Sequence, residues 1–240
     1  MQPLPEGVDP RTFALLGAFD PMLSEGALKP PEFHTSTFIA ETAEQLEHWF
    51  CQAYGLGMDM QNPDGLMYTR VVNPTIEIFE NRIAVVEGGE AASLFASGMA
   101  AISTTCFAHL RPGDTLVFSE PVYGGTDYLF RKILPLFGIK TVGFSARMGT
   151  EAFLKVISGL ENVKMVYMES PDNPTLTLVD VPGISRVAKQ VFGPDCVVVV
   201  DSTVLGPVLQ KVLDKGADIA LYSATKSIGG HSDLIGGLAI

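Results

Sequence analysis

The sequence predicts an α/β protein with a mostly parallel sheet and helices on both faces, and two observations carry this prediction. From Asn73 onward, short apolar runs typical of buried strands alternate with stretches of helical periodicity. Strands that alternate with helices build βαβ units, in which successive strands run parallel. Ligands of such sheets bind beyond the carboxyl ends of the strands, so these ends are where we expect chemistry.

The first 60 residues differ from the rest because prolines interrupt regular structure throughout them. These prolines are Pro3, Pro5, Pro10, Pro21, Pro30 and Pro31. We therefore expect irregular structure and an N-terminal arm over residues 1–60, followed by one large domain over residues 61–240.

The first expected helix begins at Asn73-Pro74, where Asn is a good N-cap and Pro fits the first turn. It continues over residues 75–87 and ends at Gly88-Gly89. A strand is expected over residues 92–96, and a second helix from Ser97 to about Leu110.

The remaining elements follow in alternation. Strands are expected over residues 115–118, 140–144, 163–168 and 197–200, in the run before Ser223, and at the end of the chain over residues 238–240. Helices are expected between them over residues 126–137, 151–160 and 184–192.

Composition excludes several classes of function. The formal net charge of −11 argues against nucleic acid and anionic membranes as partners, since both attract clustered Lys and Arg. The three cysteines have no CxxC pair, so neither a disulfide framework nor a zinc site is expected, and Cys196 is expected to be a buried thiol. We read no signal peptide near the N-terminus and expect a cytoplasmic protein that handles small molecules.

Two charged residues follow expected strands. Asp201 comes directly after the valine run 197–200, where an unpaired charge is costly. One interpretation is a helix N-cap; the other is a carboxylate paired with a cationic ligand group such as a protonated pyridine ring. Lys226 follows Ser223 and Thr225, whose hydroxyls can bind phosphate, and a lysine there can form an imine with an aldehyde cofactor.

Two further strand ends carry candidates. Ser97-Gly98-Met99 opens a helix, whose first backbone N–H groups can bind an anion. Tyr123 can stack on a planar cofactor and serve as an acid or base. A lysine, a carboxylate, an anion site and an aromatic ring together indicate pyridoxal 5′-phosphate (PLP), held by Lys226 as a Schiff base.

Competing motifs are missing from the sequence. No G-x-G-x-x-G opens a helix, and neither a phosphate-binding G-x-x-x-x-G-K-[ST] loop nor a G-x-S-x-G elbow is present. No His, Cys and Asp cluster has metal-ligand spacing, so no metal is expected.

The chain resembles the Cys/Met-metabolism family of PLP-dependent enzymes, which includes cystathionine γ-synthase, cystathionine γ-lyase and methionine γ-lyase. The resemblance runs from about Ala18 to the last residue and rests on ordered motifs. They are Tyr68-Thr-Arg70-Val-Val-Asn73-Pro74-Thr75, Ser97-Gly98-Met99, Tyr123-Gly-Gly-Thr126, Glu169-Ser170-Pro171-Asp-Asn173-Pro174, Asp201-Ser-Thr203, Ser223-Ala-Thr225-Lys226 and Gly230-His231-Ser-Asp233.

The resemblance implies the aspartate-aminotransferase-like fold, PLP fold type I, in a homotetramer of close dimers with shared active sites. It implies Lys226 as the cofactor lysine, Asp201 as the partner of the ring nitrogen, and Tyr123 stacked on the ring. Phosphate ligands would be Ser97, Gly98, Met99, Ser223 and Thr225, with Tyr68 and Arg70 reaching the neighbouring subunit's phosphate. Asn173 would lie near the cofactor's O3′ and the substrate, and Thr203 would contact the cofactor beside Asp201.

The implied reaction is γ-elimination or γ-replacement on a sulfur amino acid or homoserine ester. Cystathionine β-lyase, O-acetylhomoserine sulfhydrylase and an inactive PLP-binding fragment stay open as alternatives. Three positions depart from the family pattern: Ser202 replaces a common Asn, Val204 replaces a larger residue, and Gly125 stands where methionine γ-lyases often have Cys. Family members continue for about another domain, which supplies the arginine for the substrate carboxylate, so we expect this chain to be a fragment without its C-terminal small domain.

Overall fold

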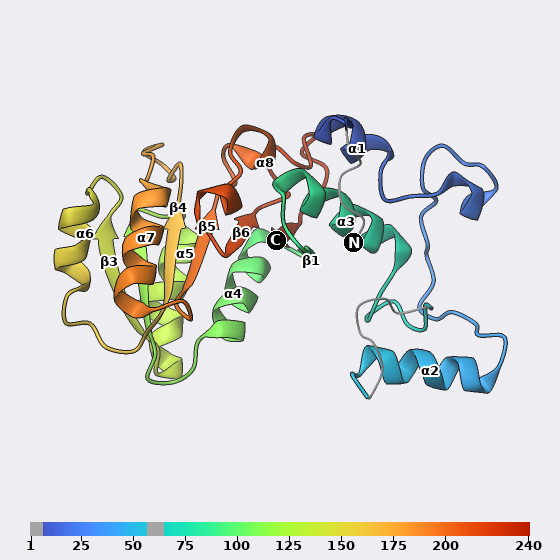
Figure 1. The fold of residues 1–240 in the computed structure, drawn as a ribbon, viewed down its shortest axis with the longest axis horizontal. Helices are drawn as coiled ribbons and strands as arrows, with labels where there is room; N and C mark the ends of the chain where they lie inside the picture. The colour runs from blue at the N-terminus through green and yellow to red at the C-terminus, as the bar shows by residue number, and fades with distance from the viewer. Residues whose placement is uncertain (1–6, 57–64) are drawn as a thin grey trace. The chain divides into compact units, whose positions relative to one another are not determined.

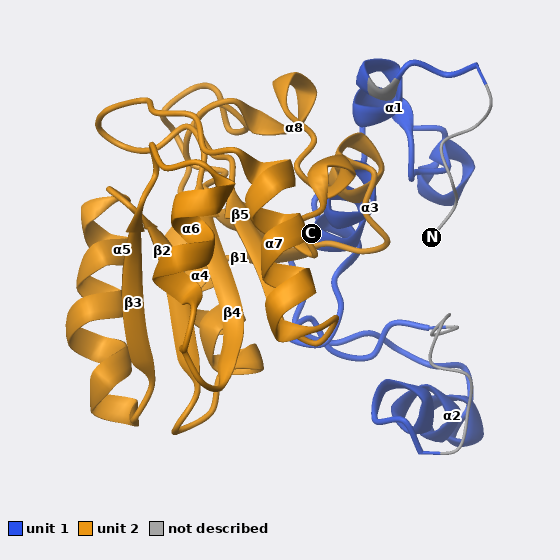
Figure 2. Ribbon diagram, turned by 60° about the vertical axis from the view of Figure 1, so that its left-hand side comes forward, with its two compact units in different colours: residues 1–82 blue, residues 83–240 orange. Residues whose placement is uncertain are grey.

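The computed structural model describes residues 7–56 and 65–240. They fall into two compact units, Met1–Arg82 (unit 1) and Ile83–Ile240 (unit 2), which Figure 2 colours separately. The domain boundary expected between residues 60 and 61 lies outside the described residues.

Unit 2 is built on a seven-stranded sheet with the order β1-β7-β6-β5-β4-β2-β3 (Figure 1). Every strand runs in the same direction except β7, which is antiparallel to both of its neighbours. The mostly parallel sheet predicted from the sequence is therefore confirmed. The strands are β1 (Ser93–Phe95), β2 (Thr115–Glu120), β3 (Lys140–Ser145), β4 (Val163–Glu169), β5 (Val197–Asp201), β6 (Ile219–Tyr222) and β7 (Gly237–Ala239).

Helices cover both faces of this sheet. The helix α4 (Gly98–His109) contacts α5 (Gly124–Tyr128), and α6 (Thr150–Ile157) contacts α7 (Val181–Phe192). Connections from β1 to β2 and β2 to β3 move along the sheet in one direction, and those from β3 to β4 and β4 to β5 move back. Because parallel crossovers are right-handed, α4 and α5 lie on one face while α6 and α7 lie on the other, as Figures 1 and 2 show.

The core of unit 2 lies between the central strands and the α4–α5 face. Phe130 packs edge-on against Phe118 of β2 at 5.1 Å and against Tyr167 of β4 at 5.0 Å, measured between ring centroids. Edge-to-face pairs of this kind stabilise a fold by about 0.5–1.5 kcal/mol beyond their burial. All three side chains are fully buried.

The continuous helix predicted over residues 126–137 is wrong. Only Gly124–Tyr128 is α-helical; a π-helical turn over Leu129–Ile133 and a 3-10 turn over Leu134–Phe137 follow. Pro135 explains the break, since it has no N–H to donate and its ring clashes with the carbonyl four residues earlier.

The connection from β5 to β6 is short, and its structure shows whether Asp201 is a helix N-cap. It contains α8 (Gly206–Leu209) and the 3-10 turn η4 (Leu213–Lys215), and Leu205 occupies the N-cap position of α8. The interpretation of Asp201 as a helix N-cap is therefore wrong, because Asp201 is the last residue of β5 and no helix begins beside it.

Unit 1 contains more regular structure than the prolines suggested. The described part holds α1 (Pro10–Leu16), the 3-10 turn η1 (Pro21–Ser24), α2 (Ala43–Ala53) and the start of α3 (Pro74–Glu87). The irregular structure expected over residues 1–60 is wrong at α2, which begins where Thr42 Oγ1 accepts from Gln45 N at 3.1 Å. None of the described helices has both the length and the apolar composition needed to cross a membrane.

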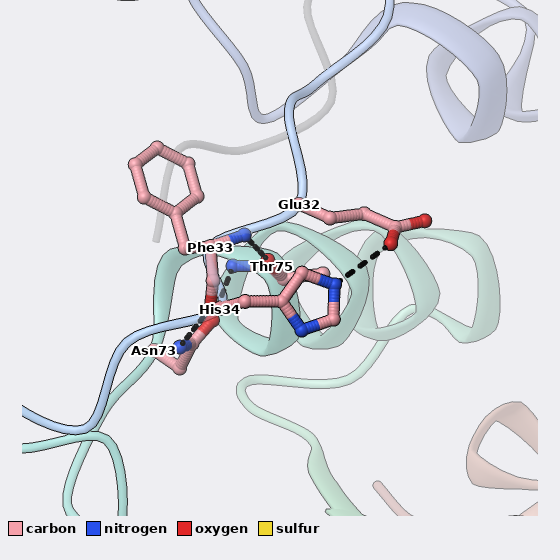
Figure 3. A network of polar contacts seen from close by, with 5 residues as sticks. All are labelled: Glu32, Phe33, His34, Asn73 and Thr75. Carbon is pink, nitrogen blue, oxygen red and sulfur yellow. Dashed lines mark hydrogen bonds and ion pairs between the residues drawn. The ribbon is translucent and has the colours of Figure 1, made fainter.

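The start of α3 confirms the predicted cap. Asn73 is buried, and its Oδ1 accepts a hydrogen bond from Thr75 N at 2.9 Å. Figure 3 shows the surrounding network, in which Asn73 Nδ2 donates to Phe33 O at 3.1 Å and Phe33 N donates to Thr75 Oγ1 at 2.9 Å. These bonds attach Phe33 to the start of α3. The helix ends at Gly88, as predicted, with a positive φ of 89°.

Candidate active site

A cavity of about 490 Å³ opens at the carboxyl ends of β1, β2, β4, β5 and β6. The predicted residues among its lining are Ser97, Gly98, Met99, Tyr123, Asn173, Asp201, Thr203, Ser223, Thr225 and Lys226. All of them belong to unit 2, so one compact unit brings together residues that are far apart in the sequence. Sequence reasoning gave no site role to the other lining residues, which are Ile102, Glu169, Pro171, Val204 and Ser227.

The start of α4 forms one wall of this cavity. Ser97 caps the helix by accepting from Ala100 N at 3.0 Å, which leaves the amides of Gly98 and Met99 in the first turn without an intrahelical acceptor. A side chain at Gly98 would come within 2.9 Å of Ser223 Cβ, and one at Gly237 within 2.1 Å of Ser97 O. Glycine is therefore required for the helix start to lie against Ser223, which brings the first amides of α4 and a hydroxyl together, the kind of groups that bind anions.

A buried carboxylate forms another part of the lining. Asp201 is only 7% exposed, and burial raises its pKa. Its Oδ1 accepts from Thr203 N at 3.0 Å and from Thr203 Oγ1 at 2.6 Å, and its Oδ2 accepts from Tyr167 OH at 3.2 Å. Thr203 Oγ1 in turn accepts from Ser223 N at 2.8 Å, which fixes the direction in which the hydroxyl donates.

These neighbours orient Asp201 without neutralising it. Burial also raises the pKa of Tyr167, so this hydroxyl stays protonated and donates. Among the described residues, no cationic side chain forms an ion pair with Asp201. A cationic ring nitrogen in the cavity would supply the missing charge and return the pKa of Asp201 towards its usual range.

Lys226 follows β6 in a compact turn. Its backbone N donates to Ser223 O at 3.1 Å, and its carbonyl accepts from Gly230 N at 3.0 Å. A Cβ at Gly229 would lie 2.8 Å from Ala224 O, so only glycine allows the turn to close. Lys226 itself is exposed at the cavity.

The neighbouring Thr225 hydroxyl already has partners. Its Oγ1 donates to Gly236 O at 3.2 Å and accepts from Gly236 N at 3.1 Å. To bind a phosphate as predicted, the hydroxyl of Thr225 would have to give up its hydrogen bond to Gly236 O and donate to the phosphate instead.

Two loops carry the remaining predicted residues of the cavity. Tyr123 is 50% exposed and occupies the N-cap position of α5. A side chain at Gly125 would come within 2.7 Å of the Tyr123 ring and 3.0 Å of Met99 Sδ, so glycine there allows the ring to pack against this wall. Asn173 is exposed in the loop after β4, beside the buried Asp172.

Glu169 joins these two loops. It is the last residue of β4, 4% exposed, and burial together with the charge of Asp201 raises its pKa to about 7. Its two oxygens accept from the backbone amides of Tyr123 and Asn173. The sequence carries two signals for this residue: Glu169 ends an apolar strand, as Asp201 does, and it opens the motif Glu169-Ser170-Pro171.

Tyr68 and Arg70 lie in unit 1. The Arg70 guanidinium lies over the Tyr68 ring, 5.4 Å from its centroid, and Tyr68 is 40% exposed. Thr37 forms a β-bridge with Tyr68, which attaches this segment to residues 36–38.

Comparison with known proteins decides the family. The family model of Cys/Met metabolism PLP-dependent enzymes matches residues 14–240. The chain belongs to this family. The resemblance predicted from the sequence motifs is thereby confirmed, and so is PLP as the cofactor of the family.

Several relatives have related activities. The chain is 37% identical to an L-methionine gamma-lyase from Pseudomonas deceptionensis, with 95% of this chain and 54% of that protein aligned. It is 38% identical to a cystathionine beta-lyase from Bacillus subtilis, with 89% and 49% aligned. It is 34% identical to an O-acetyl-L-homoserine sulfhydrylase from Leptospira meyeri, with 99% and 50% aligned.

The fold is also shared with a solved structure, that of metB from Corynebacterium glutamicum. The TM-score is 0.84 at 30% identity, over 99% of this chain and 56% of that one. This match confirms PLP fold type I for the residues at hand. The chain spans about half the length of the curated relatives it matches.

The residues of the cavity suit PLP. Amides of Gly98 and Met99 with the Ser223 hydroxyl suit its phosphate, the buried Asp201 suits its ring nitrogen, and Lys226 suits its aldehyde. Among the described residues, no three His, Cys, Asp or Glu side chains gather as a metal site would require.

Proposed function

We propose that this protein uses PLP, held through Lys226, to catalyse γ-elimination or γ-replacement on a sulfur amino acid or a homoserine ester. The observation that carries the proposal is one cavity lined both by Lys226 and by the buried carboxylate of Asp201. A lysine at the mouth of such a cavity binds an aldehyde, and a carboxylate inside it binds a cation. Membership of the PLP-dependent family supports the same assignment.

Bound PLP supplies an electron sink for bond cleavage next to the substrate's α-carbon. Asp201 keeps the ring nitrogen protonated, and Thr203 and Tyr167 hold the carboxylate in place for that task. With PLP and substrate bound, the free amine of Lys226 would take protons from Cα and Cβ of the substrate and return them to the carbon chain. Tyr123 lies at the same cavity and serves as a second acid or base.

The remaining cavity residues bind and orient. Ser97, Gly98, Met99, Ser223 and Thr225 hold the phosphate, and Asn173 lies near the ring hydroxyl and the substrate. Tyr68 and Arg70 serve the phosphate of a neighbouring subunit in a homotetramer of close dimers. Exposed apolar side chains of unit 1, among them Leu23 at 84% and Ile39 at 95%, support subunit contacts there. A cytoplasmic location is supported by three free cysteines.

The test is the product released from different amino acids by the complete polypeptide loaded with PLP. The proposal predicts 2-oxobutyrate from L-methionine or L-cystathionine, or replacement of the γ-substituent of an O-acylated homoserine by a thiol. Pyruvate from L-cystathionine would instead establish a β-lyase, an activity named for one relative at 38% identity. Failure of every substrate with PLP bound would contradict the proposal.

A polypeptide of these 240 residues alone separates the enzyme from the inactive-fragment alternative. We expect it to bind PLP through Lys226 with little turnover, because the family resemblance implies that the arginine for the substrate carboxylate belongs to the half of the relatives that this chain does not match. Full turnover by the 240-residue polypeptide would show that its own residues bind the substrate carboxylate.

A further inference from the structure

Glu169 occupies a place in the sheet that the proposed mechanism does not use. It ends β4, directly opposite Asp201 at the end of the neighbouring strand β5. Only 4% of Glu169 is exposed, and it contributes to the lining of the cavity. Two carboxyl groups therefore lie side by side at strand ends in a buried setting, which is costly unless each has a task.

The two oxygens of Glu169 bind two different loops. Oε2 accepts from Tyr123 N at 2.9 Å, in the loop that follows β2. Oε1 accepts from Asn173 N at 2.8 Å, in the loop that follows β4. Because β2 and β4 are neighbours in the sheet, one carboxylate spans both loops across the edge of the cavity.

The surroundings of Glu169 are acidic. Burial and the charges of Asp201 on β5 and Asp172 in the following loop raise its pKa, and the amides of Tyr123 and Asn173 lower it, which together bring the pKa to about 7. Among the described residues, no cationic side chain forms an ion pair with Glu169. The charged form is thus stabilised chiefly by the two amides, and neutralising it removes one of their acceptors.

From this geometry we infer that Glu169 is a positioning residue, whose carboxylate sets Tyr123 and Asn173 at their places on the cavity. The inference rests on the proposed function for the roles of those two side chains, whereas the bridge between the loops stands on the contacts alone. Glu169 acts through the backbone of each loop and need not touch substrate. A misplacement of about 1 Å at a reacting group can cost roughly 100-fold in rate, so a loosened bridge has a measurable effect.

The test compares Glu169→Gln with Glu120→Gln in the complete, PLP-loaded protein. Glu120 is the matched control, because it also ends a strand, β2, but its carboxylate pairs with Arg131 rather than with backbone amides. Glu169→Gln keeps the size of the side chain and replaces one acceptor oxygen by a donor. Hydrogen exchange at the amides of Tyr123 and Asn173 is measured alongside kcat and KM.

In Glu169→Gln we expect at least one of the two amides to lose about 10-fold or more of its protection, and kcat to fall about 10-fold or more with a smaller change in KM. In the parent protein and in Glu120→Gln, kcat should fall at low pH as Glu169 takes up a proton. In Glu169→Gln this fall should be absent. Unchanged protection and unchanged kcat in Glu169→Gln would overturn the inference, while turnover by the parent protein would leave the proposed function intact.

Measurements on the parent protein alone cover two further cases, a parent without turnover and a variant that does not fold. If the parent turns over no substrate, the proposed function fails, and the amide protection still tests the bridge. If Glu169→Gln does not fold, protection of the two amides in the PLP-loaded parent is followed from pH 8 to pH 5. Protection that falls at both positions together as Glu169 takes up a proton supports the bridge, and protection that stays constant overturns it.

Discussion

The two compact units hold their predicted site residues in different ways. In unit 2, Asp201 is 7% exposed and has three hydrogen bonds from within the unit. In unit 1, Tyr68 is 40% exposed and its clearest side-chain contact is the Arg70 guanidinium, at 5.4 Å. The sheet of unit 2 thus organises its own site, whereas Tyr68 and Arg70 have the exposure expected of residues that act on another subunit.

Loss of the cofactor lysine should have the largest effect. Lys226→Ala removes both the covalent link to PLP and the proposed base, and acid–base groups alone contribute about 10²–10⁴-fold. We expect kcat to fall by at least that factor, as measured by keto-acid release. Lys155→Ala, an exposed lysine on α6, is the control and should match the parent protein. A Lys226→Ala variant with more than a tenth of the parent's kcat would be incompatible with the role.

Asp201→Asn should have the next largest effect. An opposite charge beside a titratable group shifts its pKa by about 1–3 units, so the ring nitrogen loses roughly 10- to 1,000-fold in proton affinity. Turnover should fall within that range while the phosphate contacts retain PLP. Thr203→Val is the graded comparison: it removes one neutral donor to Asp201, about 1 kcal/mol, together with the acceptor of Ser223 N, and should lower kcat about 5-fold or more. Equal kcat in Asp201→Asn and the parent would refute the charge pairing.

A substitution at Arg70 tests the proposed role of unit 1 at a neighbouring subunit's site. Loss of a charge-assisted hydrogen bond of about 1.5–3 kcal/mol predicts that Arg70→Ala raises the Kd for PLP roughly 10-fold or more. Arg11→Ala is the control in unit 1, since Arg11 pairs with the exposed Asp9. Mixing Arg70→Ala with Lys226→Ala subunits should restore part of the activity, because a shared site takes each intact residue from a different chain. A proven hybrid without recovered activity would show that Arg70 acts within its own chain.

Stability, unlike turnover, should respond to the ionisation of Glu169 even without cofactor. The folded pKa of Glu169, about 7, exceeds the ordinary value of 4.5. Between pH 4.5 and pH 7 the Glu169 carboxyl is deprotonated in the unfolded chain but still protonated in the folded chain. The free energy of unfolding therefore falls as pH rises through this window. The full cost above pH 7 is roughly 3 kcal/mol.

Urea unfolding of the cofactor-free protein at pH 5 and pH 8 measures this slope. Glu169→Gln should lose less stability between the two pH values than the parent, by roughly 2–3 kcal/mol. Glu120→Gln, which removes a strand-end carboxylate but leaves Glu169 in place, is the matched control and should lose as much as the parent. Identical slopes in Glu169→Gln and the parent would mean that Glu169 ionises normally in the fold.

The sequence predicted the parts of this molecule that depend on local patterns. Short apolar runs predicted the strands, and the residues after them, such as Asp201 and Lys226, could be placed at the sheet edge because parallel strands end together. Two elements that were predicted wrongly also carry local signals. Pro135 marks the break in the helix expected over residues 126–137, and Thr42 with Gln45 marks the start of α2. These single residues decide the local structure against the helical periodicity and the proline content around them.

The bridging role of Glu169 depends on contacts that no local pattern reveals. Its partner Tyr123 is 46 residues away, and Tyr167 is 34 residues from Asp201, so each pair meets only once the strands have a defined order. The family motifs identify the site residues, but they do not show which hydroxyl or amide donates to which carboxylate. Those hydrogen-bond partners follow from the distances in the folded unit.

The most direct test of the central claim, that the strand-end cavity of unit 2 binds PLP through Lys226, is borohydride reduction of the PLP-loaded protein followed by peptide mass mapping. Reduction converts the imine to a stable pyridoxyl adduct on the lysine that carries it. We predict this mass on the peptide containing Lys226, and its loss when the cofactor is removed before reduction. An adduct on Lys189 or Lys211 with Lys226 unlabelled would contradict it.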